Sequence, residues 1–204
     1  AAGIGGIAIN DNATLANNAT VALANDVITT ANGFISAASG TVLTLDGAIA
    51  GPGSIGKNGA GKLLLNGVNT YTGSTSVNAG NLAVMGSATT TTITVHSGAT
   101  LSGNGTTGSV IALAGSFVAP GASIGTLNIA GDYSLATGSI LLNELTSTGS
   151  SDLVAVTGAA TLASGAVINV TKLDAPRYVL GTRYTVLSAA NGVSGTFALT
   201  GNTN

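Results

Sequence analysis

The sequence predicts an all-β solenoid, a fold in which short strands coil and stack on one another. Its composition is the first observation: of 204 residues, 31 are Gly, 6% are charged and 3% are aromatic. Thr, Ser, Asn and small aliphatic residues favour strands and turns, while the helix formers Glu, Lys, Arg and Gln are scarce. An ordinary globular domain carries about 25% charged residues, so the low charge also argues against a compact globule.

Short β segments that end in a turn signal are the second observation. Apolar residues alternate within each segment, which places one row of side chains inside and a row of Thr, Ser and Asn outside. The turns contain Gly or Asn, which tolerate the positive φ of a sharp corner. The clearest segments are 41–45, 62–65, 92–95 and 126–129.

A recurring strand–turn–strand phrase is the third observation, and it favours a solenoid over a sandwich or a barrel. The phrase runs through Ala79-Gly80, Ser97-Gly98 and Ala114-Gly115. Its spacing of roughly 16 to 20 residues is the length of one coil in a stacked repeat. A sandwich core would also need more bulky aromatic side chains than this chain has.

The chain changes character near Asp132, which predicts two regions. We expect solenoid coils in residues 1–130, including a repeat at 56–84, and C-terminal coils with a cap in residues 131–204. An open solenoid needs such a cap to protect its last edge. A hairpin is predicted around 173–181, with Pro176 in its loop. The longer strands predicted in the second region are 139–145, 153–156, 166–171 and 183–188.

Composition also bounds the function. A net charge of −2 and a mean hydropathy of +0.52 exclude disorder. The five basic residues are too few and too scattered to neutralise a phosphate backbone, so no nucleic-acid partner is expected. No apolar run approaches the roughly 18 residues that span a bilayer. The N-terminus lacks the basic start of a signal peptide, so we expect a mature or excised segment. Without Cys, no disulfide supports the fold.

No catalytic, cofactor-binding or metal-ligating residue stands out, and we expect neither a cofactor nor a metal. His96 is the single histidine, and a metal site there would need carboxylates that the sequence does not place nearby. We expect His96 to be a solvent-facing turn residue. No Ser lies in a nucleophile motif such as G-x-S-x-G, which argues against a Ser-His-Asp triad.

A polysaccharide-cleaving enzyme is the enzymatic alternative, and it would need paired carboxylates. Asp26 and Asp46 lie about one coil apart and could stack on neighbouring rungs. Turn roles are the favoured interpretation of both, since Asp46 precedes a glycine. Glu144 is expected at an exposed strand position. The sequence therefore predicts a protein that is not an enzyme.

Residues 56–84 contain the motif Gly-x-Gly-x-Leu-x-Leu-x-Gly-x-Asn-Thr-Tyr-Thr-Gly, which begins at Gly59. This segment closely resembles the autotransporter-associated β-strand repeat of Gram-negative passenger domains, with Ser74 where the family has a second Gly. Within the repeat, Tyr71 looks like a turn-packing residue. The residues of the repeat motif are Gly61, Leu63, Leu65, Gly67, Asn69, Tyr71 and Gly73.

Residues 152–197 are similar to the C-terminal passenger segment called the autochaperone region. Residues 118–129 look like the passenger phrase that precedes the final coils. The residues that carry the autochaperone likeness are Gly181, Tyr184, Val186, Leu187, Gly192, Val193, Gly195 and Phe197.

The resemblance implies a right-handed parallel β-helix that is exported across the inner membrane and then through an outer-membrane β-barrel translocator of the same polypeptide. It implies a location at the bacterial cell surface or outside the cell, and a virulence-associated role in adhesion or host-cell interaction. The C-terminal part would promote passenger folding. The implied partner is a host cell-surface or matrix protein or a glycan. A soluble ligand that alters host-cell signalling is a further alternative to the polysaccharide-cleaving enzyme.

Overall fold

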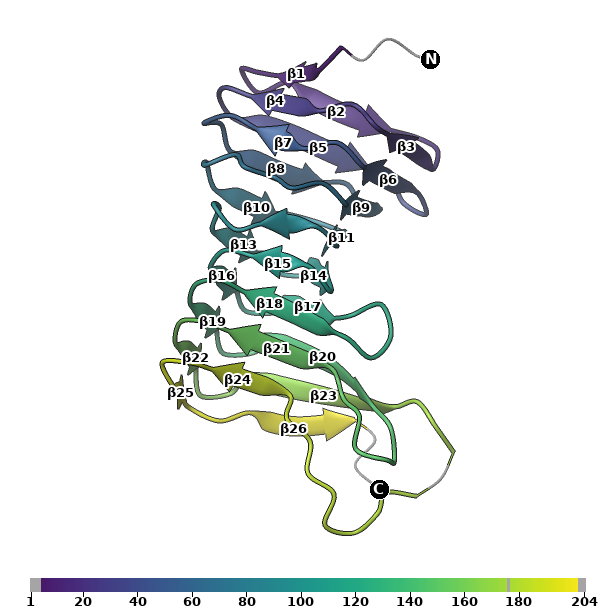
Figure 1. Cartoon of the computed structure of the whole chain (residues 1–204), viewed down its shortest axis with the longest axis vertical. Helices are drawn as coiled ribbons and strands as arrows, with labels where there is room; N and C mark the ends of the chain where they lie inside the picture. Colours follow the sequence, from purple (N-terminus) through teal and green to yellow (C-terminus); the bar gives the residue numbers. More distant parts are fainter. Residues whose placement is uncertain (1–4, 176, 202–204) are drawn as a thin grey trace.

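The computed structural model, described for residues 5–175 and 177–201, is a tall column of stacked coils (Figure 1). Its described residues form strands and turns without a helix. Every pair of neighbouring strands runs parallel, and each sheet takes its next strand from the next coil along the chain. This arrangement is a right-handed parallel β-helix, which confirms the predicted all-β solenoid.

Each coil passes through three faces. The first long sheet contains β2 (Thr14–Asn17), β5 (Gly33–Ala37), β8 (Ile55–Asn58), β10 (Thr75–Val77), β13 (Ile93–Val95), β16 (Val110–Ala112), β19 (Tyr133–Leu135), β22 (Ala160–Leu162) and β25 (Val193–Ser194). The second long sheet contains β3 (Val21–Leu23), β6 (Val42–Leu45), β9 (Lys62–Leu65), β11 (Asn81–Val84), β14 (Thr100–Gly103), β17 (Phe117–Pro120), β20 (Ile140–Leu145), β23 (Val167–Lys172) and β26 (Ala198–Gly201).

The third face is divided into two shorter sheets. The first holds β1 (Ile7–Ile9), β4 (Val27–Thr29) and β7 (Ile49–Ala50), and the second holds β12 (Ser87–Ala88), β15 (Thr106–Thr107), β18 (Thr126–Ile129), β21 (Leu153–Val156) and β24 (Leu187–Ala189). The break falls in the coil that contains the repeat at 56–84, between β7 and β12.

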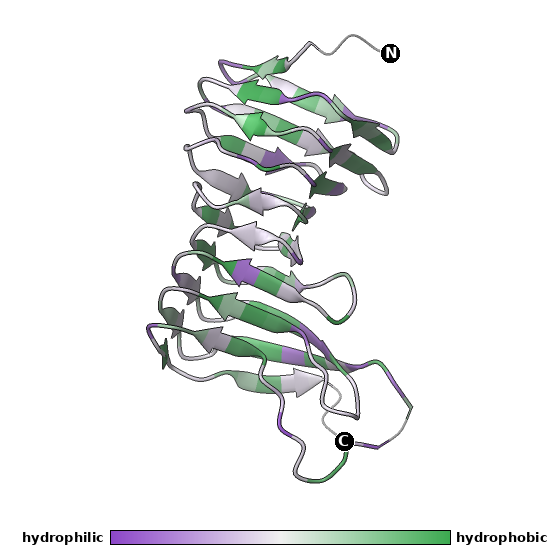
Figure 2. Ribbon diagram, viewed as in Figure 1, coloured by the Kyte–Doolittle hydropathy of each residue, from purple (hydrophilic) through white to green (hydrophobic). Residues whose placement is uncertain are grey.

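The core is a set of aliphatic rows that run along the axis of the column. In the second long sheet, Leu43, Leu63, Leu82 and Leu101 stack in register and are at most 1% exposed. Each such side chain contributes about 1.5–3 kcal/mol of burial free energy. Strands in every coil carry apolar residues, from the first coil to the last (Figure 2). Alternation along short strands therefore gives one continuous core, as the sequence predicts.

A column of glycines makes the corner between the first and second long sheets. Gly40, Gly59, Gly80, Gly98, Gly115, Gly138 and Gly165 occupy this corner in consecutive coils, all with positive φ. Other residues rarely adopt this backbone conformation, because a Cβ atom collides with the neighbouring carbonyl. The recurring Ala-Gly phrase of the sequence is this corner.

Most predicted strands are confirmed, with two corrections near the C-terminus. The strands at 62–65, 126–129 and 153–156 have the predicted bounds. The strand expected at 183–188 begins only at Leu187, and no paired strands form the hairpin expected around 173–181, of which Pro176 lies outside the described residues. The described residues 173–175 and 177–186 form no strand and leave the coil as an irregular segment, which we call the 173–186 segment.

Coil length also grows toward the C-terminus. Ile93 pairs with Val110, within the predicted interval, whereas Ala160 pairs with Val193, well beyond it. The added residues lie in the 121–125 loop, the 146–151 loop and the 173–186 segment, and the strands on either side keep their stacking.

Lys57 lies inside the column, in an inner row between Ile35 and Val77. Its side chain is 0% exposed. The Nζ atom donates hydrogen bonds to the carbonyl oxygens of Asn58, Gly59 and Ala79, at 2.9, 2.8 and 2.9 Å. These three acceptors satisfy the ammonium group and join two successive coils at the glycine corner, which is why a lysine is tolerated in an aliphatic row.

Two buried tyrosines differ in whether the hydroxyl group has a hydrogen-bond partner. Tyr71 and Tyr133 are both 1% exposed. The Tyr71 Oη atom lies 2.6 Å from the Thr75 Oγ1 atom, whereas the Tyr133 hydroxyl has no hydrogen-bond partner among the described residues. A buried hydroxyl without a partner costs about 1–3 kcal/mol of desolvation.

This difference predicts opposite effects of the same substitution. Tyr71→Phe removes a buried hydrogen bond and should lower the free energy of unfolding by about 1 kcal/mol. Tyr133→Phe removes a buried hydroxyl that has no partner, and should raise that free energy by about 1 kcal/mol. Urea unfolding followed by circular dichroism measures both, and equal shifts of the same sign would contradict the contrast.

The buried ammonium group predicts a rise in stability at alkaline pH. Burial lowers the pKa of Lys57 from 10.5 to about 8. Between these two values the unfolded chain holds a proton that the folded chain has lost, so the free energy of unfolding rises with pH. Lys57→Met should remove this rise, and Lys62→Met, on the next strand, should retain it. Urea unfolding across this pH window measures the slope, and an unchanged slope in Lys57→Met would contradict the assignment.

Candidate functional site

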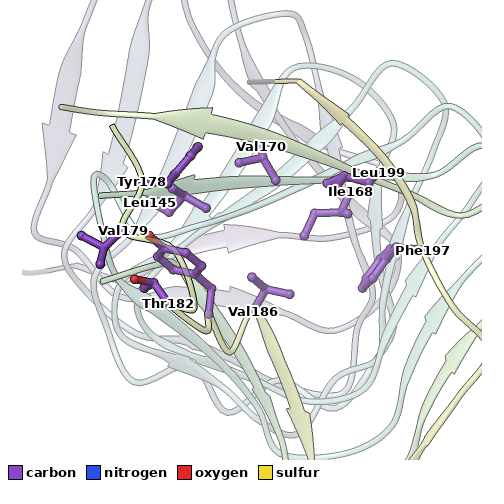
Figure 3. Close-up of a pocket in the computed structure, with 10 residues that line it drawn as sticks. Leu145, Ile168, Val170, Tyr178, Val179, Thr182, Val186, Phe197 and Leu199 are labelled. Atoms are coloured by element: carbon purple, nitrogen blue, oxygen red, sulfur yellow. The ribbon is translucent and has the colours of Figure 1, made fainter. Parts of the chain in front are cut away.

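An apolar hollow lies at the C-terminal end of the column, where no further coil covers the inner rows. It has a volume of about 450 Å³. Leu145 and Ile168 form its floor from β20 and β23, and Leu199 of β26 borders it at 61% exposure. The labelled side chains gather around one common space (Figure 3). The inner row that is buried from Leu43 to Ile168 therefore becomes exposed here, at Leu199.

The 173–186 segment folds over this hollow through aromatic side chains. The rings of Tyr178 and Tyr184 meet edge to face, with centroids 6.2 Å apart at 74°. The Lys172 Nζ atom lies 4.8 Å from the centroid of the Tyr178 ring, within the range of a cation–π interaction. Edge-to-face pairs contribute about 0.5–1.5 kcal/mol beyond burial, so these contacts hold an otherwise irregular segment in place.

Polar contacts join the 173–186 segment to the 146–151 loop. The Ser147 main-chain N–H donates to both carboxylate oxygens of Asp174, at 3.0 and 2.9 Å, and its hydroxyl donates to Oδ2 at 2.6 Å. The Tyr184 hydroxyl donates to the Thr146 carbonyl at 2.7 Å. The 146–151 loop and the 173–186 segment therefore form one unit at the C-terminal end of the column, which we call the end unit.

The residues of the autochaperone likeness divide into two groups in space. Tyr184, Val186 and Phe197 line the hollow, and all three pack against the buried core. The others continue the last coil: Leu187 pairs with Val154, Val193 pairs with Ala160, and Gly192 and Gly195 turn the chain with positive φ, as Gly181 does in the 173–186 segment. The structure thus places three of these residues together in the hollow and the rest in the coil or the segment beside it.

Asn69 shows what the repeat motif does locally. Its side chain is 2% exposed and fully bonded. The Oδ1 atom accepts from the Ile49 N–H at 2.9 Å, and Nδ2 donates to the Ser87 carbonyl at 2.9 Å and to the Gly67 carbonyl at 3.0 Å. Ile49 belongs to β7 and Ser87 to β12, so the amide bridges the break between the two sheets of the third face.

The remaining residues of the repeat motif pack the coils against one another. Leu63 and Leu65 lie in the inner rows, and Tyr71 is buried between β9 and β10. Gly61, Gly67 and Gly73 each pass so close to the preceding coil that an added Cβ atom would collide with its backbone.

The isolated chemical candidates lie in separate places. His96 follows β13 and is half-buried, less exposed than the solvent-facing turn position expected. Asp26 and Asp46 are exposed turn residues: one Asp26 oxygen accepts from the Ala48 N–H and one Asp46 oxygen from the Asn66 amide. Within the described ranges, no three His, Cys, Asp or Glu side chains group to hold a metal ion.

Asp152 and Glu144 are brought together although the sequence separates them. Asp152 is 1% exposed, and its two oxygens accept from the Gly125 and Glu144 main-chain N–H groups, both at 2.8 Å. Burial raises the pKa of Asp152, against the effect of these hydrogen bonds. Because both oxygens are occupied, the carboxylate anchors the 121–125 loop and the start of β21 to β20. Glu144 lies on that strand, as predicted, but it is half-buried and not exposed, because it lies beside Asp152.

Three residues with buried or bridging charges were not predicted from the sequence: Lys57, Asp152 and Asp174. Lys57 stands two residues after Ile55, so the alternation places it on the inner row, and that signal could have been used. The two carboxylates reach partners 27 residues away, a distance set by loop paths that no local pattern encodes.

The fold and this end site define a class: a β-solenoid that presents long strand faces and ends in an apolar surface. No described helix is long and apolar enough to cross a membrane.

Residues 56–84 match the passenger-associated transport repeat. The chain is 38% identical over 157 residues to an extracellular serine protease of Serratia marcescens, and 35% identical over 158 residues to a second protein of that name and organism.

A third relative is the adhesin BmaC autotransporter of Brucella suis biovar 1 (strain 1330), 43% identical over 81 residues. The aligned residues make up 73% of this chain for each Serratia protein and 38% for the adhesin. By the repeat and these relatives, the chain is a segment of an autotransporter passenger. Passengers of this class are extracellular or displayed on the cell surface, which places the chain there.

The relatives are much longer proteins. The aligned segment is 15% of each Serratia protein and 2% of the Brucella adhesin. Their named activities therefore describe proteins of which this segment corresponds to a small part.

The contact between Asp174 and Ser147 predicts a pH-dependent release of the end unit. The Ser147 hydroxyl, with help from its N–H and from Lys172, holds the pKa of Asp174 below its ordinary value of 3.8. The contact is therefore present above pH 3.8 and is lost as the pH falls through the lower, folded-state pKa. Asp174→Asn should imitate the protonated form, so that thermolysin at neutral pH cleaves the 173–186 segment faster. Asp46→Asn, on a remote turn, is the control, and equal cleavage of both variants would contradict the role of Asp174.

Proposed function

We propose that this passenger segment presents an adhesive surface to host cells, and that residues 131–204 promote the folding of the coils before them. One observation carries the folding role: Tyr184, Val186 and Phe197 pack against the last exposed end of a continuous core. A solenoid gains stability only when one coil stacks on the next. A preassembled end with bulky side chains offers the first such surface.

The adhesive role is supported by the shape and by the Brucella relative, which is named an adhesin. Stacked coils expose long, regular strand faces with few charges. Repeat solenoids use such extended faces for binding. We also propose that this segment acts without catalysis, because its carboxylates hold turns and loops.

Truncation tests the folding role. Removing residues 174–204 deletes the last coil and the end unit, and should abolish cooperative unfolding and cause aggregation during refolding. Removing residues 1–26 deletes the first coil and serves as the matched control, which should refold with only a modest loss of stability. Refolding yield and urea unfolding measure both. Equal refolding of the two truncated chains would contradict a special role for the C-terminal part.

Beads coated with the 204-residue chain test the adhesive role. They should bind cultured epithelial cells more than beads coated with the urea-unfolded chain do. Binding at the level of the unfolded control would contradict adhesion. A signalling response to the soluble chain without bead attachment would favour the receptor-ligand alternative.

A further inference from the structure

A polar hollow with one aromatic wall lies on the outer face of the first long sheet. It crosses β5, β8 and β10 and has a volume of about 260 Å³. We call it the Phe34 hollow, and its lining includes Asn32, Phe34, Ser54, Gly56, Ser76 and Asn78. It is separate from the apolar hollow at the C-terminal end, with which it shares no residue.

The hollow exists because one outward position has no side chain. Phe34, Gly56 and Ser76 are register partners on three successive strands. A Cβ atom on Gly56 would lie 2.5 Å from the Phe34 Cδ1 atom, so the ring leans over the glycine. The ring is half-buried, which fixes its position and leaves part of it open toward the hollow.

Hydroxyl and amide groups supply the rest of the lining. The Asn78 Nδ2 atom donates to the Asn58 Oδ1 atom at 2.9 Å, which orients both amides. In the described part of the chain, the side chains of Asn32 and Ser76 bond to no protein group. Polar rows on this face repeat at the strand spacing of about 4.8 Å. The hollow thus offers the side chains of Asn32 and Ser76 as hydrogen-bonding groups that the fold has not used.

Charge is absent from the lining, since every lining residue is neutral. A binding site for an acidic ligand would need basic side chains, and Lys57 of the same strand points into the core. A neutral ligand that is apolar on one side and rich in hydroxyls on the other matches the ring and the amides. Sugars have this chemistry, because their C–H face packs on an aromatic ring while their hydroxyls pair with Asn and Ser.

We propose that the Phe34 hollow binds a neutral oligosaccharide. This inference rests on the proposed adhesive function and names its ligand class. The sugar ring packs against Phe34 above Gly56, and its hydroxyls bond to Ser76, Asn78 and Asn32. The chain of sugars then follows the polar rows along the column, where the register places His96 next to Asn78.

Calorimetric titration of the 204-residue chain tests the proposal. The probes are cellohexaose, mannohexaose, maltohexaose and chitohexaose, with hexagalacturonate as the acidic comparison. We expect binding of at least one neutral probe. Phe34→Ala should weaken that binding at least tenfold, and Phe34→Tyr, which retains the ring, should keep it. Ile111→Ala is the matched control, because Ile111 is an exposed residue of the same outward row outside the hollow.

Circular dichroism and urea unfolding confirm that each variant is folded before titration. No binding of any neutral probe, tighter binding of hexagalacturonate, or an equal effect of Phe34→Ala and Ile111→Ala would overturn the proposal. The bead assay separates this failure from that of adhesion itself. Beads that still bind cells while the neutral probes do not bind would leave adhesion standing and remove the glycan site.

Discussion

The structure depends on one backbone constraint, the left-handed corner that seven consecutive coils make at a glycine between the two long sheets. Glycine meets it without strain, because it has no Cβ atom to collide with the neighbouring carbonyl. The corner glycines also bond to one another: the N–H of Gly98 donates to the carbonyl of Gly115, Gly115 to Gly138, and Gly138 to Gly165, at 2.9 to 3.0 Å. This ladder joins the corners of four successive coils and helps to hold the register of the strands on both sides.

Register in turn decides what is buried. A slip of one residue would exchange the inner and outer rows of a strand, so the aliphatic rows form only where successive corners align. The same dependence explains the two ends of the column. Each coil covers the inner side chains of the coil before it. The inner side chains of the last coil, such as Leu199, have no following coil and are covered only in part by the 173–186 segment. The C-terminal hollow is therefore a consequence of stacking and not an addition to it.

The sequence predicts the repeating parts of this structure well, because they depend on local rules. Alternation and the glycine corner suffice for the inner rows and for most strands. The 173–186 segment could not be predicted, since it is held by Tyr184 and Asp174 through contacts with a loop far away in the chain. Lys57 illustrates a third case: the alternation places it inside, but only the three carbonyl groups at the corner make that position acceptable.

Five of the twelve charged side chains of this chain hold backbone groups. Asp26, Asp132, Asp152 and Asp174 each accept hydrogen bonds from main-chain N–H groups of another coil or loop, and Lys57 donates to main-chain carbonyls. Charges used in this way provide hydrogen-bond partners for main-chain groups in turns that no strand pairs with. What remains on the outer faces is mainly hydroxyl and amide chemistry. Recognition by such a surface depends on hydrogen bonds and ring contacts at fixed spacing, and it should respond little to salt, in contrast to binding that relies on charge. The scarcity of charge therefore limits the kind of partner that the faces of the column can select.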